Sequence, residues 1–384
     1  MQDIIIIGGG ITGCASAWNL ARSGRKVRLL ERHHIAAMAS GWTLGGVRQS
    51  GRDPAELPLA SAAVALWPQL SELLGYDTGY AQHGNLRLAR NRDEAALLRE
   101  MVKQQNALGL SLSFLEGNRA VRDLAPALSG QVQAASFCPS DGFADPVAAT
   151  AGFARASEQY GARVDQGISV ESVALSKGRV CGVETSSGFI ATDCVIVAAG
   201  THSPNLLAPL GLTLPLKVTK VQVVQTEVVP PCFNQVFGVA NADCAGRQEP
   251  NGRFRFTSGL FAFDGDPDRW SEALLLPSDK DKAALRARVA EVLPAAACAA
   301  VSRVWGGLID LTPDALPVID APRRVPGLII AAGFSGHGFG IGPISGRLVA
   351  ELAQGLDPFL STRAFALDRF QSTSMSPAQL TLHG

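Results

Sequence analysis

Three glycines near the start of the chain have the spacing of a phosphate-binding turn. Gly8, Gly10 and Gly13 form a G-x-G-x-x-G pattern directly after four consecutive isoleucines, residues 4–7. Four β-branched residues predict a strand buried on both faces, so the glycines fall where that strand turns into a helix. Such a turn lets the backbone approach a pyrophosphate, and the start of the helix offers it free N–H groups. The pattern therefore predicts a dinucleotide-binding site.

A carboxylate follows the second strand predicted in this unit. The helix over residues 14–23 ends at Gly24, and a strand over residues 26–30 leads directly to Glu31. A carboxylate at this place can accept hydrogen bonds from the hydroxyls of an adenosine ribose, and its charge disfavours a 2′-phosphate. Glu31 therefore favours an adenine dinucleotide that lacks this phosphate.

Two further glycine-rich segments could contact the same ligand. Residues 39–48 contain Ser40 and Thr43 among three glycines, which indicates a backbone pressed close to a ligand or else a flexible loop. Near the end of the chain, a buried strand over residues 327–332 leads through a glycine-rich loop into a helix predicted over residues 343–352. The N-terminus of that helix could stabilise negative charge, which a reduced flavin carries and a nicotinamide does not. This segment favours a flavin.

The remaining pattern predicts alternating strands and helices. A third buried strand, over residues 193–199, closes on Gly200, which could face the same ligand because ligands sit at the carboxyl ends of parallel strands. Further helices are predicted over residues 58–74, 93–108, 145–160 and 281–293, and further strands over residues 84–89, 170–175, 180–184, 218–228 and 253–261. We expect a chain of 384 residues to form two domains, one inserted into the other.

Composition argues against several classes of protein. The 34 basic and 34 acidic side chains give no net charge, which argues against binding to nucleic acid or to an anionic membrane. No apolar run approaches the ~20 residues that cross a bilayer, and we expect no signal peptide. Seven scattered cysteines without C-x-x-C spacing are expected to be reduced thiols in the cytoplasm. We expect no metal site.

Four motifs occur in an order that is found in one known family. They are the N-terminal glycine turn, Ala198-Ala199-Gly200, the segment 305–314 and the segment 333–338. Their order resembles that of the FAD-dependent D-amino-acid oxidase superfamily, in its branch of glycine and sarcosine oxidases. The resemblance implies an α/β plus α+β architecture, in which a Rossmann-like FAD-binding domain is interleaved with an antiparallel-sheet substrate domain. It implies residues 1–80, 138–212 and 304–372 for the FAD-binding domain, 81–137 and 213–303 for the substrate domain, and 373–384 for a tail.

The resemblance also implies a set of cofactor-binding positions. The ADP half of FAD would be held by Gly8, Gly10, Ile11, Thr12, Gly13, Glu31 and Arg32, with the backbone of Val170 at the adenine. The phosphates, ribityl chain and flavin would be lined by Ser40, Gly41, Thr43, Leu44, Gly45, Gly46, Ala199, Gly200, Gly307, Gly336, His337, Gly338, Phe339 and Gly340.

Departures from the family's pattern bear on how FAD and substrate are held. Relatives that bind FAD covalently have a cysteine where this chain has Gly307, or a histidine where it has Thr43, so we expect non-covalent FAD. Relatives that hold the substrate carboxylate with a cation have an arginine where this chain has Ile309, or a lysine where it has Gly340. Both cations are absent, and the space they leave favours a substrate larger than glycine.

Other cations remain as candidates for the substrate carboxylate. Arg48 and Arg52 follow the glycine loop, where sarcosine oxidases place arginines, and a planar guanidinium forms two hydrogen bonds with a carboxylate. His337 would lie beside the flavin and the substrate amine, and Lys220 is a further candidate on a strand expected to run towards the flavin. The alternatives are solvated surface cations and a histidine that only supports its loop.

The resemblance implies an enzyme that oxidises the Cα–N bond of a small amino or imino acid by hydride transfer to flavin N5. Substrates of such relatives include D-amino acids, D-hydroxyproline, proline, sarcosine and opines. The run Gly-Gly-Val-Arg-Gln at residues 45–49 and the chain length resemble catalytic β subunits of heteromeric dehydrogenases. This implies partner subunits carrying FMN or iron–sulfur centres and, through them, a peripheral place on the inner membrane.

Three alternatives stay open. The same architecture could oxidise a 2-hydroxy acid or glycerol phosphate. An NAD-dependent dehydrogenase would share the N-terminal glycine turn but not the glycine-rich turn at residues 333–343. A non-catalytic flavin-binding subunit, which only assembles a complex, would keep every motif.

Overall fold

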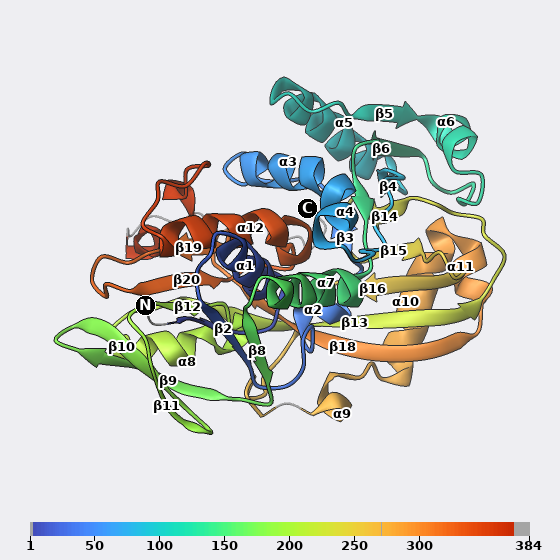
Figure 1. The fold of residues 1–384 in the computed structure, drawn as a ribbon. Helices are drawn as coiled ribbons and strands as arrows, with labels where there is room; N and C mark the ends of the chain where they lie inside the picture. Colours follow the sequence, from blue (N-terminus) through green and yellow to red (C-terminus); the bar gives the residue numbers. More distant parts are fainter. Residues whose placement is uncertain (1–2, 270, 372–384) are drawn as a thin grey trace.

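A six-stranded, mainly parallel sheet carries the glycine-rich turns (Figure 1). The structure is a computed structural model that describes residues 3–269 and 271–371. The strand order is β19 (Val318–Asp320), β20 (Leu328–Ala332), β12 (Val195–Val197), β1 (Ile4–Ile7), β2 (Val27–Glu31) and β8 (Arg163–Gln166). Only β19 is antiparallel to its neighbour. The four isoleucines of β1 are all buried because both faces of the sheet are covered.

Different layers cover the two faces of this sheet. Ile4 and Ile6 pack on the side of helices α1 (Ile11–Arg22), α3 (Leu57–Leu66), α7 (Pro146–Gln159) and α12 (Gly338–Ala353). Ile5 and Ile7 pack on the side of α8 (Ser203–Leu207) and of a three-stranded sheet with the order β11 (Gly188–Ala191), β10 (Arg179–Thr185) and β9 (Val170–Ser176). This packing on both sides fixes the carboxyl ends of β1, β12 and β20, where the glycine turns begin.

A nine-stranded sheet is the second large element. Its order is β17-β13-β16-β15-β14-β4-β6-β5, with β18 paired to β13, and every pair is antiparallel except β14 beside β4. The strands are β4 (Asn85–Ala89), β5 (Ser113–Glu116), β6 (Ala134–Cys138), β13 (Lys217–Val228), β14 (Val236–Val239), β15 (Cys244–Gln248), β16 (Arg253–Ser258), β17 (Phe261–Ala262) and β18 (Val301–Leu311). Helices α6 (Gly117–Leu124), α10 (Asp279–Val292) and α11 (Pro294–Cys298) share an apolar core with one face. Strand alternation turns Arg87 and Asn85 of β4 to the opposite face, away from Leu86 and Leu88.

The chain passes repeatedly between the two large sheets, and the predicted fold class is confirmed (Figure 1). Strands β4 and β6 of the nine-stranded sheet, for example, lie in sequence between β2 and β8 of the six-stranded sheet. The predicted domain boundaries remain predictions, and β18 runs across the one placed at residue 304.

Two predicted helices have different bounds in the structure. Instead of one helix over residues 58–74, α3 ends at Leu66, a 3₁₀ turn follows, and α4 (Leu70–Leu74) completes the segment. Pro68 explains the break, because proline has no N–H for a helix interior. The helix predicted from residue 343 begins at Gly338, with Pro343 inside it. Burial of its apolar neighbours in α12 offsets the hydrogen bond that this proline removes.

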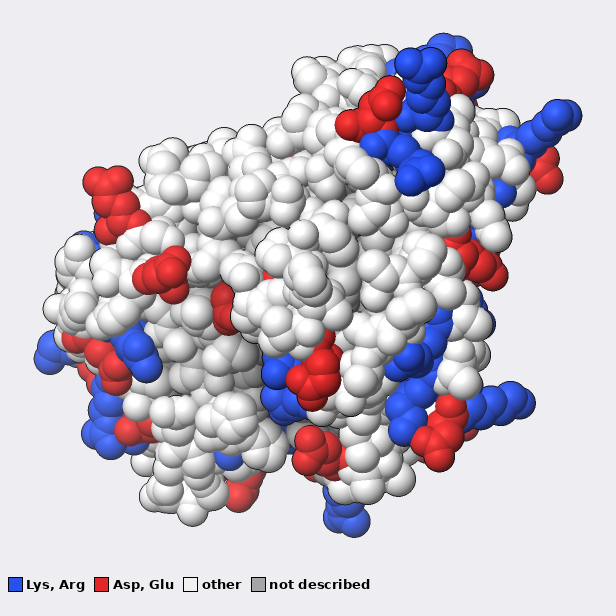
Figure 2. All heavy atoms as spheres, turned by 90° about the vertical axis from the view of Figure 1, so that its right-hand side faces the viewer, with Lys and Arg blue, Asp and Glu red and all other residues white. Residues whose placement is uncertain are grey.

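Acidic and basic side chains are interspersed on the face shown in Figure 2, with uncharged surface between them. Among the described residues, no helix is long and apolar enough to cross a bilayer. In the same part of the chain, no group of three or more His, Cys, Asp or Glu side chains is placed to hold a metal ion. Residues 373–384, predicted as a tail, lie outside the described residues.

Candidate active site

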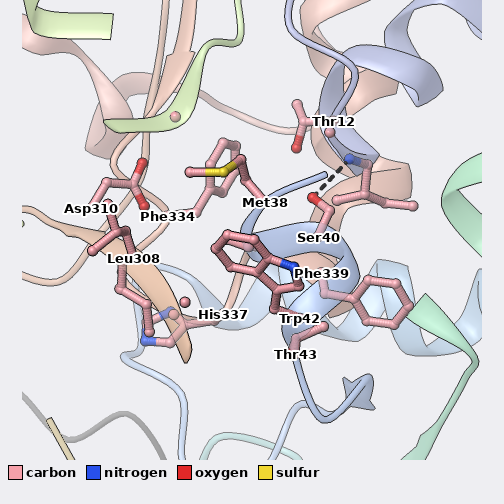
Figure 3. Close-up of a pocket in the computed structure, with 18 of the residues that line it drawn as sticks. Thr12, Met38, Ser40, Trp42, Thr43, Leu308, Asp310, Phe334, His337 and Phe339 are labelled. Atoms are coloured by element: carbon pink, nitrogen blue, oxygen red, sulfur yellow. Dashed lines mark hydrogen bonds between the residues drawn. The ribbon is translucent and has the colours of Figure 1, made fainter. Parts of the chain in front are cut away.

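One continuous cavity lies between the glycine turns and the nine-stranded sheet. The turn after β1 and the ends of β2 and β12 line one side, and strands β4, β13, β14 and β16 line the other. Figure 3 shows Trp42 in the middle of the labelled side chains, with Leu308 and His337 on one side and Ser40 and Phe339 on the other. Segments far apart in the sequence therefore build a single site.

The turn between β1 and α1 has the backbone geometry that its glycines predict. Gly8 has a φ of +112°, and a Cβ on Gly13 would collide with the carbonyl oxygen of Gly8. The hydroxyl of Ser40 accepts a hydrogen bond of 3.0 Å from the N–H of Ile11, a first-turn donor of α1 (Figure 3). Glycine therefore permits the close approach of strand and helix, and Ser40 ties the second glycine loop to this turn.

Glu31 lines the cavity at the end of β2. One of its carboxylate oxygens accepts a hydrogen bond from the N–H of Gly9 and the other from the N–H of His33, each at 2.7 Å. The two bonds orient the carboxylate and leave further lone pairs for hydroxyl donors. Arg32 also lines the cavity, and its guanidinium forms an ion pair of 3.1 Å with Asp268.

The nine-stranded sheet holds the loop that follows α2 (Ala39–Trp42) by three consecutive carbonyl groups. The indole N–H of Trp305 donates to the Trp42 carbonyl at 3.0 Å. Arg255 donates to the Thr43 carbonyl at 2.9 Å, and Arg247 donates to the Leu44 carbonyl at 2.6 Å. This loop is therefore fixed by side chains from β15, β16 and β18, of which only Trp305 belongs to a motif named in the sequence analysis, the segment 305–314.

Asp310 of β18 organises the third glycine-rich loop. Its carboxylate accepts a hydrogen bond of 2.8 Å from the N–H of Gly333, and its backbone carbonyl accepts one of 3.1 Å from the N–H of Ser335. Burial raises the pKa of Asp310 to about 6, because the backbone donors offset the loss of water only in part. Asp310 lines the cavity, close to Phe334 in Figure 3.

His337 of this loop faces Glu56, a residue that the sequence analysis did not single out. Nδ1 of His337 lies 3.3 Å from a carboxylate oxygen of Glu56, which is 1% exposed. Burial would raise the pKa of Glu56, but His337, Arg52 and Arg48 together lower it to about 2. Burial also lowers the pKa of His337. Because an ionised carboxylate only accepts hydrogen bonds, the neutral imidazole carries its proton on Nδ1, and Nε2 keeps a lone pair.

Besides Arg32, three arginines line the cavity, and the sequence analysis named two of these three. Arg48 and Arg52 follow β3 (Gly46–Val47), and Arg87 comes from β4. Arg52 is 5% exposed, and its Nη1 has no hydrogen-bond partner among the described residues. Arg48 donates to the carbonyl of Ser50 at 3.3 Å. Burial lowers the pKa of Arg87 to about 10, with a further contribution from the positive charge of Arg52, so that Arg87 stays protonated at neutral pH.

Lys220 does not line the cavity, which corrects its place among the candidates. In β13, Val221 and Val223 line the cavity. Because alternate residues of a strand face opposite sides, Lys220 points away, and its ammonium group donates to the carbonyl of Leu274 at 3.3 Å.

Most of the predicted cofactor-binding residues line the cavity. They are Gly8, Gly10, Ile11, Thr12, Gly13, Glu31, Arg32, Ser40, Thr43, Leu44, Gly46, Val170, Ala199, Gly200, Gly307, Gly336, His337, Gly338 and Phe339. Gly41, Gly45 and Gly340 do not line it. A Cβ on Gly41 or Gly45 would collide with a backbone carbonyl behind the loop, and one on Gly340 would lie 2.8 Å from the Gly46 carbonyl. These three glycines allow the loops to pack.

The open side of the cavity fits a dinucleotide. Among the described residues, a Cβ on Gly46, which lines the cavity, would meet no atom within 4 Å, and one on Gly10 would meet only the hydroxyl of Ser40. Backbone therefore borders free space on two loops at once. The carboxylate of Glu31, the glycine turn after β1 and the glycine-rich start of α12 lie along that space, which is an arrangement that fits FAD.

The chain belongs to the family of FAD-dependent oxidoreductases whose model, "FAD dependent oxidoreductase", matches residues 3–352. It is therefore an FAD-dependent oxidoreductase, and the resemblance found in the sequence is confirmed.

Three similar proteins have names that include an amino acid. A sarcosine oxidase subunit beta of Rhizobium meliloti (strain 1021) is 28% identical over 380 residues, covering 96% of this chain and 88% of the relative. A glycine oxidase of Geobacillus kaustophilus (strain HTA426) is 27% identical over 376 residues, covering 96% and 97%. Among solved structures, an L-proline dehydrogenase from P. horikoshii superposes with a TM-score of 0.88 at 27% identity, over 98% of this chain and 99% of that one.

Proposed function

We propose that this protein oxidises the Cα–N bond of a small amino or imino acid. The observation that supports this most directly is that Arg52, with an unpaired buried donor, and the His337–Glu56 pair lie in one cavity with the FAD-binding turn. When bound, FAD supplies the hydride acceptor, N5 of its flavin ring. The protein has to hold the carboxylate, provide for the amine proton and exclude water.

Arg52 and Arg48 are proposed to bind the substrate carboxylate. A guanidinium forms two parallel hydrogen bonds with a carboxylate, and burial strengthens such a pair. His337 is proposed to accept a proton from the substrate ammonium group at Nε2, because a neutral amine is needed before hydride can leave Cα. Glu56 is a positioning residue, since it holds the Nδ1 proton of the imidazole.

We further propose that FAD is held without a covalent bond. Gly307 and Thr43 stand at the places where some relatives have an attaching cysteine or histidine, and no cysteine lines the cavity within the described residues. The relative named as a subunit beta supports the existence of partner subunits, and we propose that these carry FMN or iron–sulfur centres. All seven cysteines are free, which supports a reducing, cytoplasmic location. A place peripheral to the inner membrane, through such partners, is proposed as well.

The test is anaerobic mixing of the FAD-loaded protein with D-amino acids, sarcosine, glycine, prolines, opines, 2-hydroxy acids and glycerol phosphate. We expect one amino or imino acid to bleach the flavin absorbance, with slow recovery in air if a partner subunit is the natural electron acceptor. Bleaching by a 2-hydroxy acid or glycerol phosphate alone would contradict the proposal. A protein that no compound bleaches, with or without its partners, would be a non-catalytic flavin-binding subunit.

A further inference from the structure

One wall of the cavity carries a row of residues in register across four strands. Ladder pairing sets Thr257 of β16 opposite Ala245 of β15. Ala245 in turn is opposite Gly238 of β14, and Gly238 is beside Arg87 of β4. All four residues line the cavity. Since paired residues share one face of a sheet, Arg87 and Thr257 are the ends of a strip whose floor is formed by two small residues.

Both ends of this strip carry buried polar groups that lack a partner. Thr257 is 4% exposed, and its hydroxyl has no hydrogen-bond partner in the part of the chain that the structure describes. Arg87 is 7% exposed, and among the described residues its guanidinium has the attracting charge of Asp141 and the repelling charge of Arg52 nearby but no hydrogen bond or ion pair. Buried polar groups are normally paired because an unpaired one is destabilising, so the two side chains point to a ligand with acceptor atoms.

The charges around the strip favour an anion. Burial lowers the pKa of Arg87 most, the positive charge of Arg52 lowers it further, and the negative charge of Asp141 raises it in part. The neighbouring carboxylates are already engaged, because Glu56 holds His337 and Asp141 accepts hydrogen bonds from the backbone of the loop after β3. Two guanidinium groups with open donors therefore face one cavity.

We propose that Arg87 and Thr257 form a second anion subsite, which binds a second carboxylate of the substrate while Arg52 binds the α-carboxylate. This inference rests on the proposed function and narrows its substrates to dicarboxylic amino or imino acids. The second acid group could lie on the side chain or on the nitrogen substituent. The guanidinium of Arg87 supplies two parallel donors and the hydroxyl of Thr257 supplies a third, while the small residues Gly238 and Ala245 leave space between them for the carboxylate.

Binding is measured first, by calorimetry on the FAD-loaded protein with two non-reacting five-carbon acids, glutarate and pentanoate. They differ in the second carboxylate. We expect glutarate to bind more tightly, and Arg87→Met to weaken glutarate about 10- to 100-fold while changing pentanoate by less than about threefold. Arg87→Lys should recover part of the loss, because it restores the charge without the planar pair of donors.

A second variant, Thr257→Val, tests the subsite independently in case Arg87→Met does not fold. Thr257→Val removes only the hydroxyl and should weaken glutarate about fivefold, the scale of one hydrogen bond. Its matched control is Thr219→Val, because the hydroxyl of Thr219 is also buried without a partner but Thr219 does not line the cavity. The control should leave both acids unchanged.

Flavin reduction then distinguishes the two positions of the second carboxylate. Iminodiacetate differs from sarcosine only by a carboxylate on the N-methyl carbon, whereas aspartate differs from alanine by a carboxylate on the side chain. In one of these two pairs, we expect the dicarboxylate to reduce the flavin of the wild type faster than the monocarboxylate does. Arg87→Met should abolish that difference in rate.

Two results would overturn the subsite. Equal weakening of glutarate and pentanoate by Arg87→Met would mean that Arg52 and Arg87 share a single carboxylate, and equal binding of the two acids to the wild type would mean that no second subsite exists. Calorimetry needs no turnover, so a protein that no amino acid reduces would contradict the proposed function and still decide the subsite.

Discussion

Glu56 and His337 are 281 positions apart in the chain, yet their side chains meet 3.3 Å apart inside the cavity. Glu56 lies just before α3 and His337 just before α12, and these two helices pack against each other on the same face of the six-stranded sheet. The contact gives the imidazole a defined tautomer. It also links a proton acceptor to a carboxylate that stays ionised at every pH at which the protein is expected to work.

His337→Asn should slow flavin reduction by about 10²- to 10⁴-fold, the usual contribution of a general base, without lowering the amount of bound FAD. Stopped-flow absorbance measures the rate. In the wild type, the rate should rise with pH through the pKa of His337, which burial places below its ordinary value. Glu56→Gln removes the negative charge that favours the imidazolium, so this acid limb should move to lower pH. An unmoved limb would show that Glu56 does not act through His337.

Arg52→Met should raise the dissociation constant of a carboxylate-bearing substrate about 10- to 100-fold, because a charge-assisted pair is lost. Arg48→Ala should act in the same direction. Amines that lack the carboxylate serve as the control, and their dissociation constants should be the same for both variants as for the wild type. A variant that leaves the Michaelis constant of every reactive amino acid unchanged would exclude that arginine from carboxylate binding.

Gly13→Ala should lose bound FAD, because its Cβ would collide with the carbonyl oxygen of Gly8. The flavin-to-protein ratio after purification measures this. Gly130→Ala is the matched control, since a Cβ there meets no atom within 4 Å in the part of the chain that the structure describes. Its free energy of unfolding should stay within about 0.5 kcal/mol of the wild type. Full FAD content in Gly13→Ala would contradict the tight-turn geometry.

Asp310→Asn should alter how stability depends on pH. Burial raises the pKa of Asp310 from 3.8 to about 6 on folding, so the folded state binds this proton more tightly than the unfolded state. The free energy of unfolding of the wild type should therefore lose on the order of 3 kcal/mol as pH rises from 4 to 8, relative to Asp310→Asn. Urea titrations of both proteins at several pH values measure the difference, and a constant difference would be evidence against the raised pKa.

Lys220→Met should leave the rate of flavin reduction within about twofold of the wild type, because surface substitutions away from a site have small effects. Its ammonium group is bound to the carbonyl of Leu274, outside the cavity. A large loss of rate, with FAD content unchanged, would return Lys220 to the candidates.

What could be predicted from the sequence depends on how local each signal is. Gly8, Gly13 and Glu31 lie within one strand–turn–helix–strand unit, so their spacing alone predicts their arrangement. Arg87 and Thr257 could not be found in this way, since each is an ordinary strand residue until the register of the nine-stranded sheet brings it to the cavity wall.

Glu56 and Lys220 are two further residues whose place relative to the cavity could not be predicted from the sequence. Glu56 stands at a helix start, where an acidic residue is common for helix stability alone, so nothing local indicates a partner 281 positions away. Lys220 was placed on the correct strand, but the face it occupies depends on which alternate residues line the cavity, and those are Val221 and Val223.

The hydrogen bonds from the nine-stranded sheet to the carbonyls of residues 42–44 have a consequence for the order in which the site forms. Those carbonyls are held by Arg247, Arg255 and Trp305, so the loop cannot take its final form until β18 has left the ribosome. A nascent chain therefore contains all residues of the glycine turn after β1 long before it contains the strands that hold the loop of residues 42–44. The loop therefore depends on contacts that exist only after Trp305 has been synthesised.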